Sequence, residues 1–103
     1  IIHLKRFVAE SSSIEKDNTF VRFPFELDLS QWLPGPPAKG EQYRLYAVVN
    51  HSGSLSYGHY TAYCKVGEGA DRKWYLFNDA RVTPASESDV VSQEAYLLFY
   101  ERL

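Results

Sequence analysis

The sequence predicts an α+β domain made mainly of a twisted antiparallel sheet with small helices. Aromatic residues make up 16% of the chain, with eight Tyr and six Phe, and such side chains favour strands packed on a pleated surface. Polar turns separate the apolar runs, and only short segments carry helix-start signals. A chain of 103 residues fits one such unit.

The N-terminal quarter predicts two short strands joined by a loop. Residues 1–8 are largely apolar and predict a strand, and residues 10–18, rich in serine and charge, predict a loop. Residues 19–23 predict a second strand that ends at Pro24, because proline has no N–H to donate to a sheet ladder.

A short helical turn is predicted at residues 30–33, with Ser30 or Asp28 as its cap. The proline-rich run that begins at Pro34 ends this turn. It is expected to continue as a loop as far as Gly40.

The rest of the chain supplies most of the predicted sheet. Four longer strands are predicted at residues 43–50, 57–66, 73–78 and 95–102. Residues 86–91 predict a short helix, with Ser86 as N-cap and Asp89 at the third helical position, the arrangement of a capping box.

A histidine lies near the start of one of these strands, and an Asn-Asp pair ends the next. A glycine-bearing segment joins the two strands, so an antiparallel hairpin is the simplest geometry. Pairing of Cys64 with Lys73 sets one register. In that register His59 lies directly opposite Asn78, and their side chains share one face. A slip of one residue would place His59 opposite Asp79 instead, so either register gives the imidazole a polar neighbour.

These residues predict two members of a catalytic triad. A histidine removes a proton from a thiol or hydroxyl best when a third group fixes its tautomer and orientation, and Asn78 or Asp79 would do this for His59. The sole cysteine, Cys64, is a poor nucleophile candidate. It lies five residues along the same predicted strand, roughly 16 Å away and on the opposite face. Its simpler interpretation is a small buried apolar residue.

Each of these residues also has a structural interpretation. A lone histidine such as His59 is often a core residue, and Asn78 and Asp79 commonly cap turns or bulges. The glycine before His59 favours the functional interpretation, because glycine often marks close approach by a ligand or another backbone. A metal site made of His51, His59 and Cys64 is not predicted, since their spacing is not that of a zinc pair.

Composition and charge narrow the class of protein. The chain has 11 Lys and Arg against 13 Asp and Glu, a formal charge of -2, and so lacks the basic patch that nucleic-acid binding requires. A single cysteine excludes an internal disulfide framework and suits a reducing compartment. No apolar run approaches the roughly 18 residues that span a bilayer. We therefore expect an intracellular protein, cytoplasmic or nuclear, with no nucleic-acid or membrane partner.

Several stretches of the chain, in order and at matching spacing, resemble one known family. The chain is similar to the C-terminal half of the catalytic domain of the ubiquitin-specific proteases, which are papain-like cysteine deubiquitinases. The matching stretches are Ile-His-Leu-Lys-Arg-Phe at 2–7, Phe-Pro at 23–24 with Leu-Asp-Leu at 27–29, residues 43–48 leading to Asn-His-Ser-Gly at 50–53, Gly-His-Tyr-Thr-Ala-Tyr at 58–63, residues 74–79 and residues 95–100.

The resemblance implies a papain-like palm in which His59 is the catalytic base. It assigns Asn78 as the orienting residue and Asp79 as an acidic neighbour, and leaves open which of the two dominates. The family's nucleophile lies in a cysteine box on a helical lobe, and its zinc-binding fingers use paired cysteines; neither has a counterpart in this sequence. Residues 1–103 are thus expected to be the C-terminal part of a catalytic domain, without a cofactor and inactive alone.

The resemblance also implies partners, namely ubiquitin, ubiquitinated proteins and the N-terminal half of the same catalytic domain. In the family, a blocking loop before the catalytic histidine covers the channel for ubiquitin's C-terminal tail. The substrate-binding candidates are therefore Phe7, Ser56, Tyr57, Gly58 and Tyr60. The aromatic members of this set are equally compatible with ordinary core or half-buried strand positions.

Two other functions fit the same residues. The chain could be a catalytically inactive ubiquitin-binding or scaffolding module, because the family contains inactive members. It could also belong to a different thiol or serine hydrolase whose nucleophile lies upstream. The preceding sequence distinguishes these possibilities, since a cysteine box there supports a protease and its replacement supports an inactive module.

Overall fold

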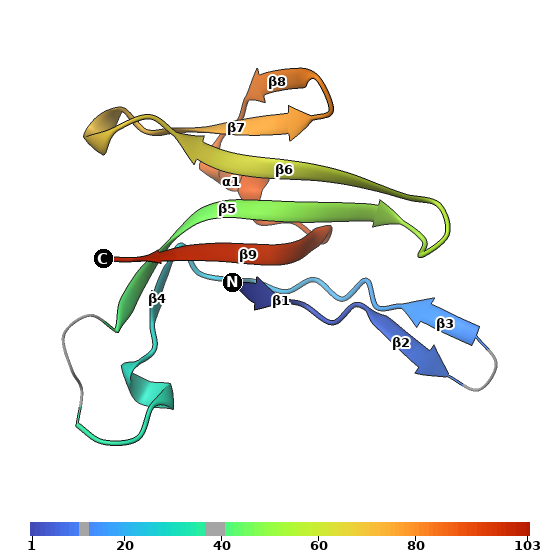
Figure 1. Cartoon of the computed structure of the whole chain (residues 1–103), viewed down its shortest axis with the longest axis horizontal. Coiled ribbons are helices and arrows are strands. Elements are labelled where there is room, and N and C mark those ends of the chain that lie inside the picture. The colour runs from blue at the N-terminus through green and yellow to red at the C-terminus, as the bar shows by residue number, and fades with distance from the viewer. Residues whose placement is uncertain (11–12, 37–40) are drawn as a thin grey trace.

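The computed structural model describes residues 1–10, 13–36 and 41–103. A seven-stranded antiparallel sheet has the strand order β1-β9-β5-β6-β7-β8, and β4 also pairs with β5 (Figure 1). Its strands are β1 (Ile2–His3), β4 (Glu26–Asp28), β5 (Gln42–Gly53), β6 (Gly58–Val66), β7 (Lys73–Asn78), β8 (Arg81–Pro84) and β9 (Ala95–Arg102). A separate hairpin contains β2 (Phe7–Glu10) and β3 (Ser13–Lys16). The short helices are η1 (Ser30–Trp32), η2 (Gly69–Asp71) and α1 (Glu87–Val90).

The core lies on the face of the sheet that α1 covers (Figure 1). Val48 of β5 is paired with Tyr63 of β6 and with Leu98 of β9, so this strand is the centre of the sheet. The buried core residues are Phe23, Leu45, Val48, Trp74, Val90, Ala95 and Leu98. Burial of each large aliphatic side chain contributes about 1.5–3 kcal/mol. The prediction of an α+β fold made mainly of antiparallel sheet is confirmed.

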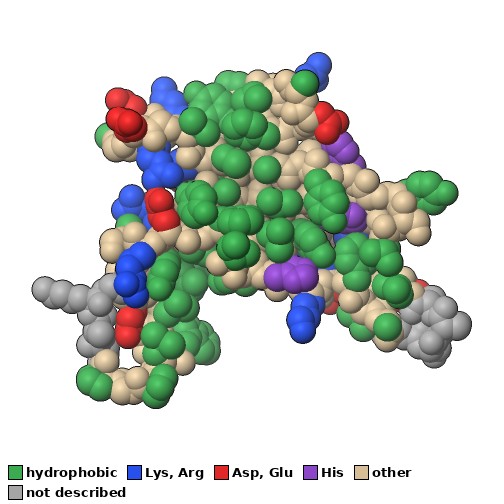
Figure 2. Space-filling model, viewed as in Figure 1, with side chains coloured by type: hydrophobic (Ala, Val, Ile, Leu, Met, Phe, Trp, Pro, Cys, Tyr) green, Lys and Arg blue, Asp and Glu red, His purple; other side chains and the backbone are tan. Residues whose placement is uncertain are grey.

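The opposite face of the sheet is also apolar. Leu97 is paired with Val49, Val49 with Ala62 and Ala62 with Phe77, which gives a row of half-buried residues across four strands. Successive residues of a strand alternate between faces, so Val49 points away from the core that holds Val48. Figure 2 shows apolar side chains gathered over this part of the sheet. The long strands therefore carry apolar residues on both faces.

Both predicted helical turns are confirmed. The backbone N–H of Ser86 donates to Oδ2 of Asp89 at 3.0 Å, and α1 begins with a capping box as predicted. The turn η1 begins after Leu29. There the carboxylate of Asp28 accepts a hydrogen bond from the backbone N–H of Ser30 at 2.9 Å, so Asp28 rather than Ser30 supplies the side-chain contact.

The predictions for the N-terminal quarter are wrong in three places. The single strand at 1–8 is two strands, β1 and β2, separated by residues 4–6. The loop at 10–18 contains β3, which pairs with β2. Residues 19–23 form no strand.

Arg6 contributes to these departures. Its side chain is 3% exposed, and its Nε donates to the carbonyl of Ala95 in β9 at 2.6 Å. Its Nη1 donates to the carbonyls of Asp17 at 3.0 Å and Thr19 at 2.8 Å. A guanidinium therefore satisfies backbone groups that would otherwise need a neighbouring strand.

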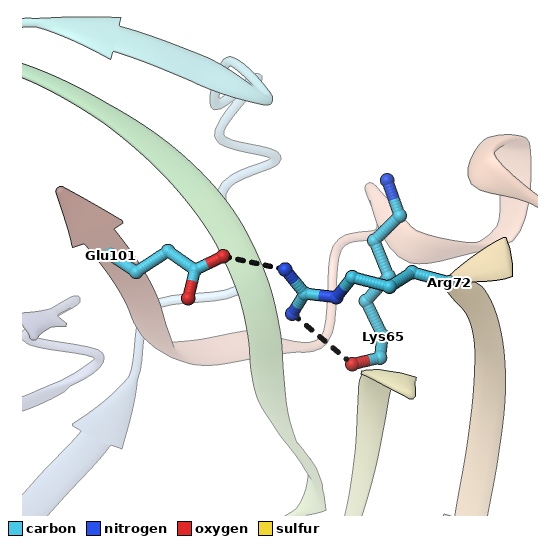
Figure 3. A network of polar contacts seen from close by, with 3 residues as sticks. All are labelled: Lys65, Arg72 and Glu101. Atoms are coloured by element: carbon cyan, nitrogen blue, oxygen red, sulfur yellow. Dashed lines mark hydrogen bonds and ion pairs between the residues drawn. The ribbon is translucent and has the colours of Figure 1, made fainter. Parts of the chain in front are cut away.

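The connection between β6 and β7 is held by the network in Figure 3. Arg72 Nη1 contacts Glu101 Oε1 of β9 at 2.7 Å, and Arg72 Nη2 donates to the carbonyl of Lys65 at 3.4 Å. The connection contains η2, and β7 begins directly after Arg72. This fixes the start of the strand that ends at Asn78.

Two short strands that the sequence did not predict, β4 and β8, complete the sheet. β8 pairs with β7 and forms one border, where Pro84 is paired with Tyr75. The two-residue β1 forms the other border. Among the described residues, no helix has the length and apolar character needed to cross a bilayer.

Candidate active site

His59 and Asn78 meet at the end of the sheet where β6 begins and β7 ends. The two atoms His59 Nε2 and Asn78 Oδ1 are 2.8 Å apart. An amide oxygen is an acceptor, so Nε2–H donates, and this hydrogen bond selects the tautomer with an unprotonated Nδ1. His59 is exposed and Asn78 half-buried. The ring therefore has one oriented nitrogen and one free basic nitrogen, which is the state required of a general base.

The ladder between β6 and β7 differs from the predicted register by two residues. Cys64 is paired with Tyr75, and not with Lys73. Continuing this ladder places His59 diagonally from Asn78 rather than directly opposite. Because side chains alternate with a period of two, the shift leaves His59 and Asn78 on the same face. The predicted direct opposition is wrong, whereas the predicted neighbourhood of the two side chains is found.

Asp79 has a different role in the structure. It occupies the two-residue turn between β7 and β8, where Asn78 is paired with Arg81. Its φ of 52° lies in the left-handed region, which aspartate adopts more readily than most residues. Its carboxylate has no hydrogen bond or ion pair with any residue that the structure describes. The structure thus brings Asn78, and not Asp79, into contact with His59.

Cys64 is not positioned as a nucleophile for His59. It lies near the C-terminal end of β6, five residues from His59, so the two side chains point to opposite faces of the sheet. The thiol is partly buried, and burial raises its pKa. A raised pKa disfavours the thiolate, which is the reactive form. Metal binding has no local support either, since no cluster of three His, Cys, Asp or Glu occurs within the described ranges.

His51 joins two of the predicted substrate-binding residues. Its ring centroid is 5.4 Å from that of Phe7 and 4.9 Å from that of Tyr60. Tyr96 lies 5.9 Å away, at a bulge of β9 where Val49 is paired with Leu97 and the next residue with Ala95. Phe7 and Tyr60 thus belong to one aromatic cluster with His51 and Tyr96, close to the start of β6, where His59 lies.

The surroundings of His51 disfavour its protonated form. The side chain is 2% exposed, and burial, followed by the positive charge of Lys16, lowers the pKa of His51 from its ordinary value. Lys16 Nζ donates to the backbone carbonyls of His51 and Gly53, each at 3.0 Å. The sequence motif contained His51, but its contacts with β2, β3 and β9 were not predictable from spacing along one strand.

The other predicted substrate-binding residues lie in the connection from β5 to β6. Ser56 and Tyr57 are exposed, Tyr57 to 89%. The backbone N–H of Tyr57 donates to Ser54 Oγ at 3.1 Å, and the N–H of Ser54 donates to the carbonyl of Tyr57 at 3.3 Å. Gly58 is paired with Gly53, so this short loop ends directly beside His59.

Comparison with known proteins identifies the family to which the chain belongs. The family model described as ubiquitin carboxyl-terminal hydrolase matches residues 1–100. Ubiquitin carboxyl-terminal hydrolase 21 of Homo sapiens is 45% identical over 102 residues, which cover 98% of this chain and 17% of that protein. Ubiquitin carboxyl-terminal hydrolase 2 of Gallus gallus is 49% identical over 102 residues, covering 98% of this chain and 28% of that protein. The chain therefore spans less than a third of these relatives.

Solved structures give the same result for the fold. The Ubp8-Sgf11-Sgf73-Sus1 SAGA DUB module contains a chain with a TM-score of 0.84 and 34% identity, matched over 98% of this chain and 23% of that one. A SAGA DUB module with Ubp8 bound to monoubiquitin has a TM-score of 0.85 and 34% identity, over 98% and 22% of the two chains. At this level of similarity, this chain shares its sheet and strand order with the two solved structures over almost its whole length.

Proposed function

The chain belongs to the ubiquitin carboxyl-terminal hydrolase family, and we propose that it supplies the catalytic histidine of a thiol-dependent deubiquitinase. The observation that carries this proposal is the contact of His59 Nε2 with Asn78 Oδ1 at 2.8 Å. It orients an exposed imidazole in the tautomer that leaves Nδ1 free to accept a proton. We assign residues 1–103 to the C-terminal part of a papain-like catalytic domain, whose cysteine-box lobe and zinc-binding fingers are supplied by other sequence.

The proposed reaction is acyl transfer through a cysteine of the N-terminal lobe. Nδ1 of His59 accepts the thiol proton, and the thiolate attacks the carbonyl of ubiquitin's terminal glycine. The resulting imidazolium gives its proton to the departing lysine amine, and a water molecule then hydrolyses the acyl-enzyme. Asn78 holds the ring throughout, because its amide oxygen accepts a hydrogen bond from Nε2–H in both protonation states of His59.

The proposed substrate-binding surface lies on both sides of His59. Ser56, Tyr57 and Gly58 precede it, and Tyr60 with Phe7 belongs to the aromatic cluster around His51. We propose that this surface borders the channel for the two glycines at the end of ubiquitin, where larger side chains would clash. The partners are then ubiquitin, ubiquitinated proteins and the N-terminal half of the domain, in the cytoplasm or nucleus.

The test uses the longer protein that contains this segment, with a fluorogenic amide at the C-terminus of ubiquitin as substrate. Hydrolysis that disappears in His59→Ala, while Cys64→Ser retains the wild-type rate, supports the proposal. Ubiquitin binding without hydrolysis identifies an inactive binding module instead. Loss of activity in Cys64→Ser, in a protein whose circular dichroism is unchanged, contradicts the assignment of the nucleophile to another lobe.

A further inference from the structure

His51 and Gly58 are packed against each other at the start of β6. His51 is paired with Tyr60 in the ladder between β5 and β6, two residues from Gly58. A Cβ atom added to Gly58 would overlap Nε2 of His51, and would come within 2.8 Å of Cε1 and 3.0 Å of Cδ2. The imidazole therefore fills the space that any side chain at position 58 would occupy.

The ring of His51 has little freedom to move out of that space. The rings of Phe7, Tyr60 and Tyr96 surround it. The backbone is fixed as well, because the N–H of His51 donates to the carbonyl of Glu94 at 2.9 Å and its carbonyl accepts from Lys16. In a closely packed interior, a displaced ring must displace its neighbours.

Burial of His51 removes a polar ring nitrogen from water without giving it a hydrogen-bond partner in the part of the chain that the structure describes. Nδ1 is buried and has no hydrogen-bond partner among the described residues. Buried polar atoms normally have partners, and an apolar side chain of similar size would avoid this cost. Packing stability alone therefore does not explain a histidine at this position.

We propose that His51 is a positioning residue for His59. The ring of His51 fixes the position of Gly58, and Gly58 is bonded directly to His59, so His51 determines where the imidazole of His59 stands relative to Asn78. This inference rests on the proposed function, because it assigns His59 as the base. A displacement of about 1 Å in a catalytic group can lower the rate on the order of 100-fold.

Two explanations of the glycine at position 58 make opposite predictions. If the tail of ubiquitin needs the space, then Gly58→Ala raises KM, and a smaller residue at position 51 gives no relief. If His51 needs the space, then Gly58→Ala lowers kcat, and it causes little further loss once position 51 carries a smaller residue. Comparison of the two single variants with the double variant separates these cases.

The experiment measures kcat and KM of the longer protein with the fluorogenic ubiquitin substrate. Gly58→Ala is expected to lower kcat on the order of 10- to 100-fold and to change KM by no more than a few-fold. Adding His51→Ala is expected to bring kcat back to within a few-fold of His51→Ala alone. The ¹⁵N shift of His59 Nε2, which reports its hydrogen bond, should change in Gly58→Ala, and in the double variant it should match that of His51→Ala alone.

Gly53→Ala is the matched control at the other end of the same loop. A Cβ there would overlap the backbone carbonyl of Tyr57, and the φ of 89° disfavours any side chain. A smaller residue at position 51 cannot relieve either problem, so His51→Ala should not rescue Gly53→Ala. Rescue of both glycine variants alike would show a general loosening of the loop and would overturn the proposal.

Three further results test whether His51 positions His59. An unchanged kcat with a raised KM in Gly58→Ala overturns the proposal even if the double variant does not fold. Multiplicative losses in a folded double variant also overturn it. His51→Val, a β-branched residue suited to a strand, replaces His51→Ala if the alanine variant unfolds. If His59→Ala remains active, the proposed function has failed, and non-additive melting temperatures of the His51 and Gly58 variants then establish their packing alone.

Discussion

His59 and Asn78 meet diagonally across the ladder between β6 and β7. The register that pairs Ala62 with Phe77 places Asn78 level with Thr61, two residues from His59 on the same face. Diagonal neighbours in a sheet are about 7–8 Å apart at their Cα atoms, so only a long side chain such as imidazole reaches the partner. The 2.8 Å contact of Nε2 with Oδ1 therefore depends on both side chains.

Removal of the His59 side chain should lower turnover more than removal of the Asn78 side chain. In the longer protein, His59→Ala is expected to abolish hydrolysis, because it deletes the base. Asn78→Ala is expected to lower kcat on the order of 10- to 1,000-fold, because it removes only the group that orients the base. Steady-state kinetics with the fluorogenic ubiquitin substrate provide the comparison. Equal losses in the two variants would show that Asn78 does more than orient the ring.

Asp79→Asn should leave kcat within a few-fold of the wild-type value. Asparagine tolerates the left-handed conformation that Asp79 adopts, so this change removes the charge without straining the turn. The charge is expected to be dispensable because the carboxylate lies in the turn beyond Asn78. The same kinetic assay checks this. A loss larger than that of Asn78→Ala would assign the orienting role to Asp79.

The stability of the chain should fall in mildly acidic solution because of His51. Burial and the nearby charge of Lys16 lower the pKa of His51 from its ordinary value of 6.5. As the pH falls, the unfolded chain therefore binds a proton at this histidine at a higher pH than the folded chain does. The stability gained from the neutral ring is present above pH 6.5 and is lost as the pH falls below it. The free energy of unfolding in urea, measured from about pH 7.5 to about pH 5, tests this.

His51→Phe is the control for that titration, because it keeps an aromatic ring and removes the ionisable group. Its stability should depend less on pH over the same range. The carboxylates of Asp17, Asp28 and Asp89 contribute at lower pH, since hydrogen bonds lower their pKa from the ordinary 3.8. Parallel pH profiles for the wild type and His51→Phe would mean that another group is responsible.

Arg6→Lys should destabilise the chain by about 2 kcal/mol or more, although it conserves the charge. A lysine ammonium cannot reproduce the planar geometry with which Arg6 bonds the carbonyls of Ala95 and Thr19. Urea unfolding gives the difference in free energy. Arg81→Lys, an exposed substitution in β8, should change it by less than about 0.5 kcal/mol. Equal effects of the two substitutions would contradict the role given to Arg6.

The long strands could be predicted from the sequence because their apolar and aromatic residues are continuous. The strands at 73–78 and 95–102 have the predicted bounds, and those of β5 and β6 differ by a few residues. The N-terminal quarter could not be predicted, because Arg6 bonds carbonyls from segments distant in sequence. Its hydrogen bonds replace the strand pairing that the residue pattern favoured.

The site was predicted in outline and missed in detail. His59 and Asn78 could be brought together from the sequence, because neighbouring strands place their ends side by side. The register was missed, because the connection closes around η2 and lets Val66 pair with Lys73. The cluster around His51 was missed, because its rings come from β2, β6 and β9.

The two borders of the large sheet restrict how copies of this chain can aggregate. β1 exposes only two residues of backbone, and β8 contains Pro84, which has no N–H to offer to another chain. Addition of a foreign strand is therefore disfavoured along β1 and β8 themselves. Self-association through the apolar face that contains Val49 and Phe77 should be weakened by a charge placed at either residue.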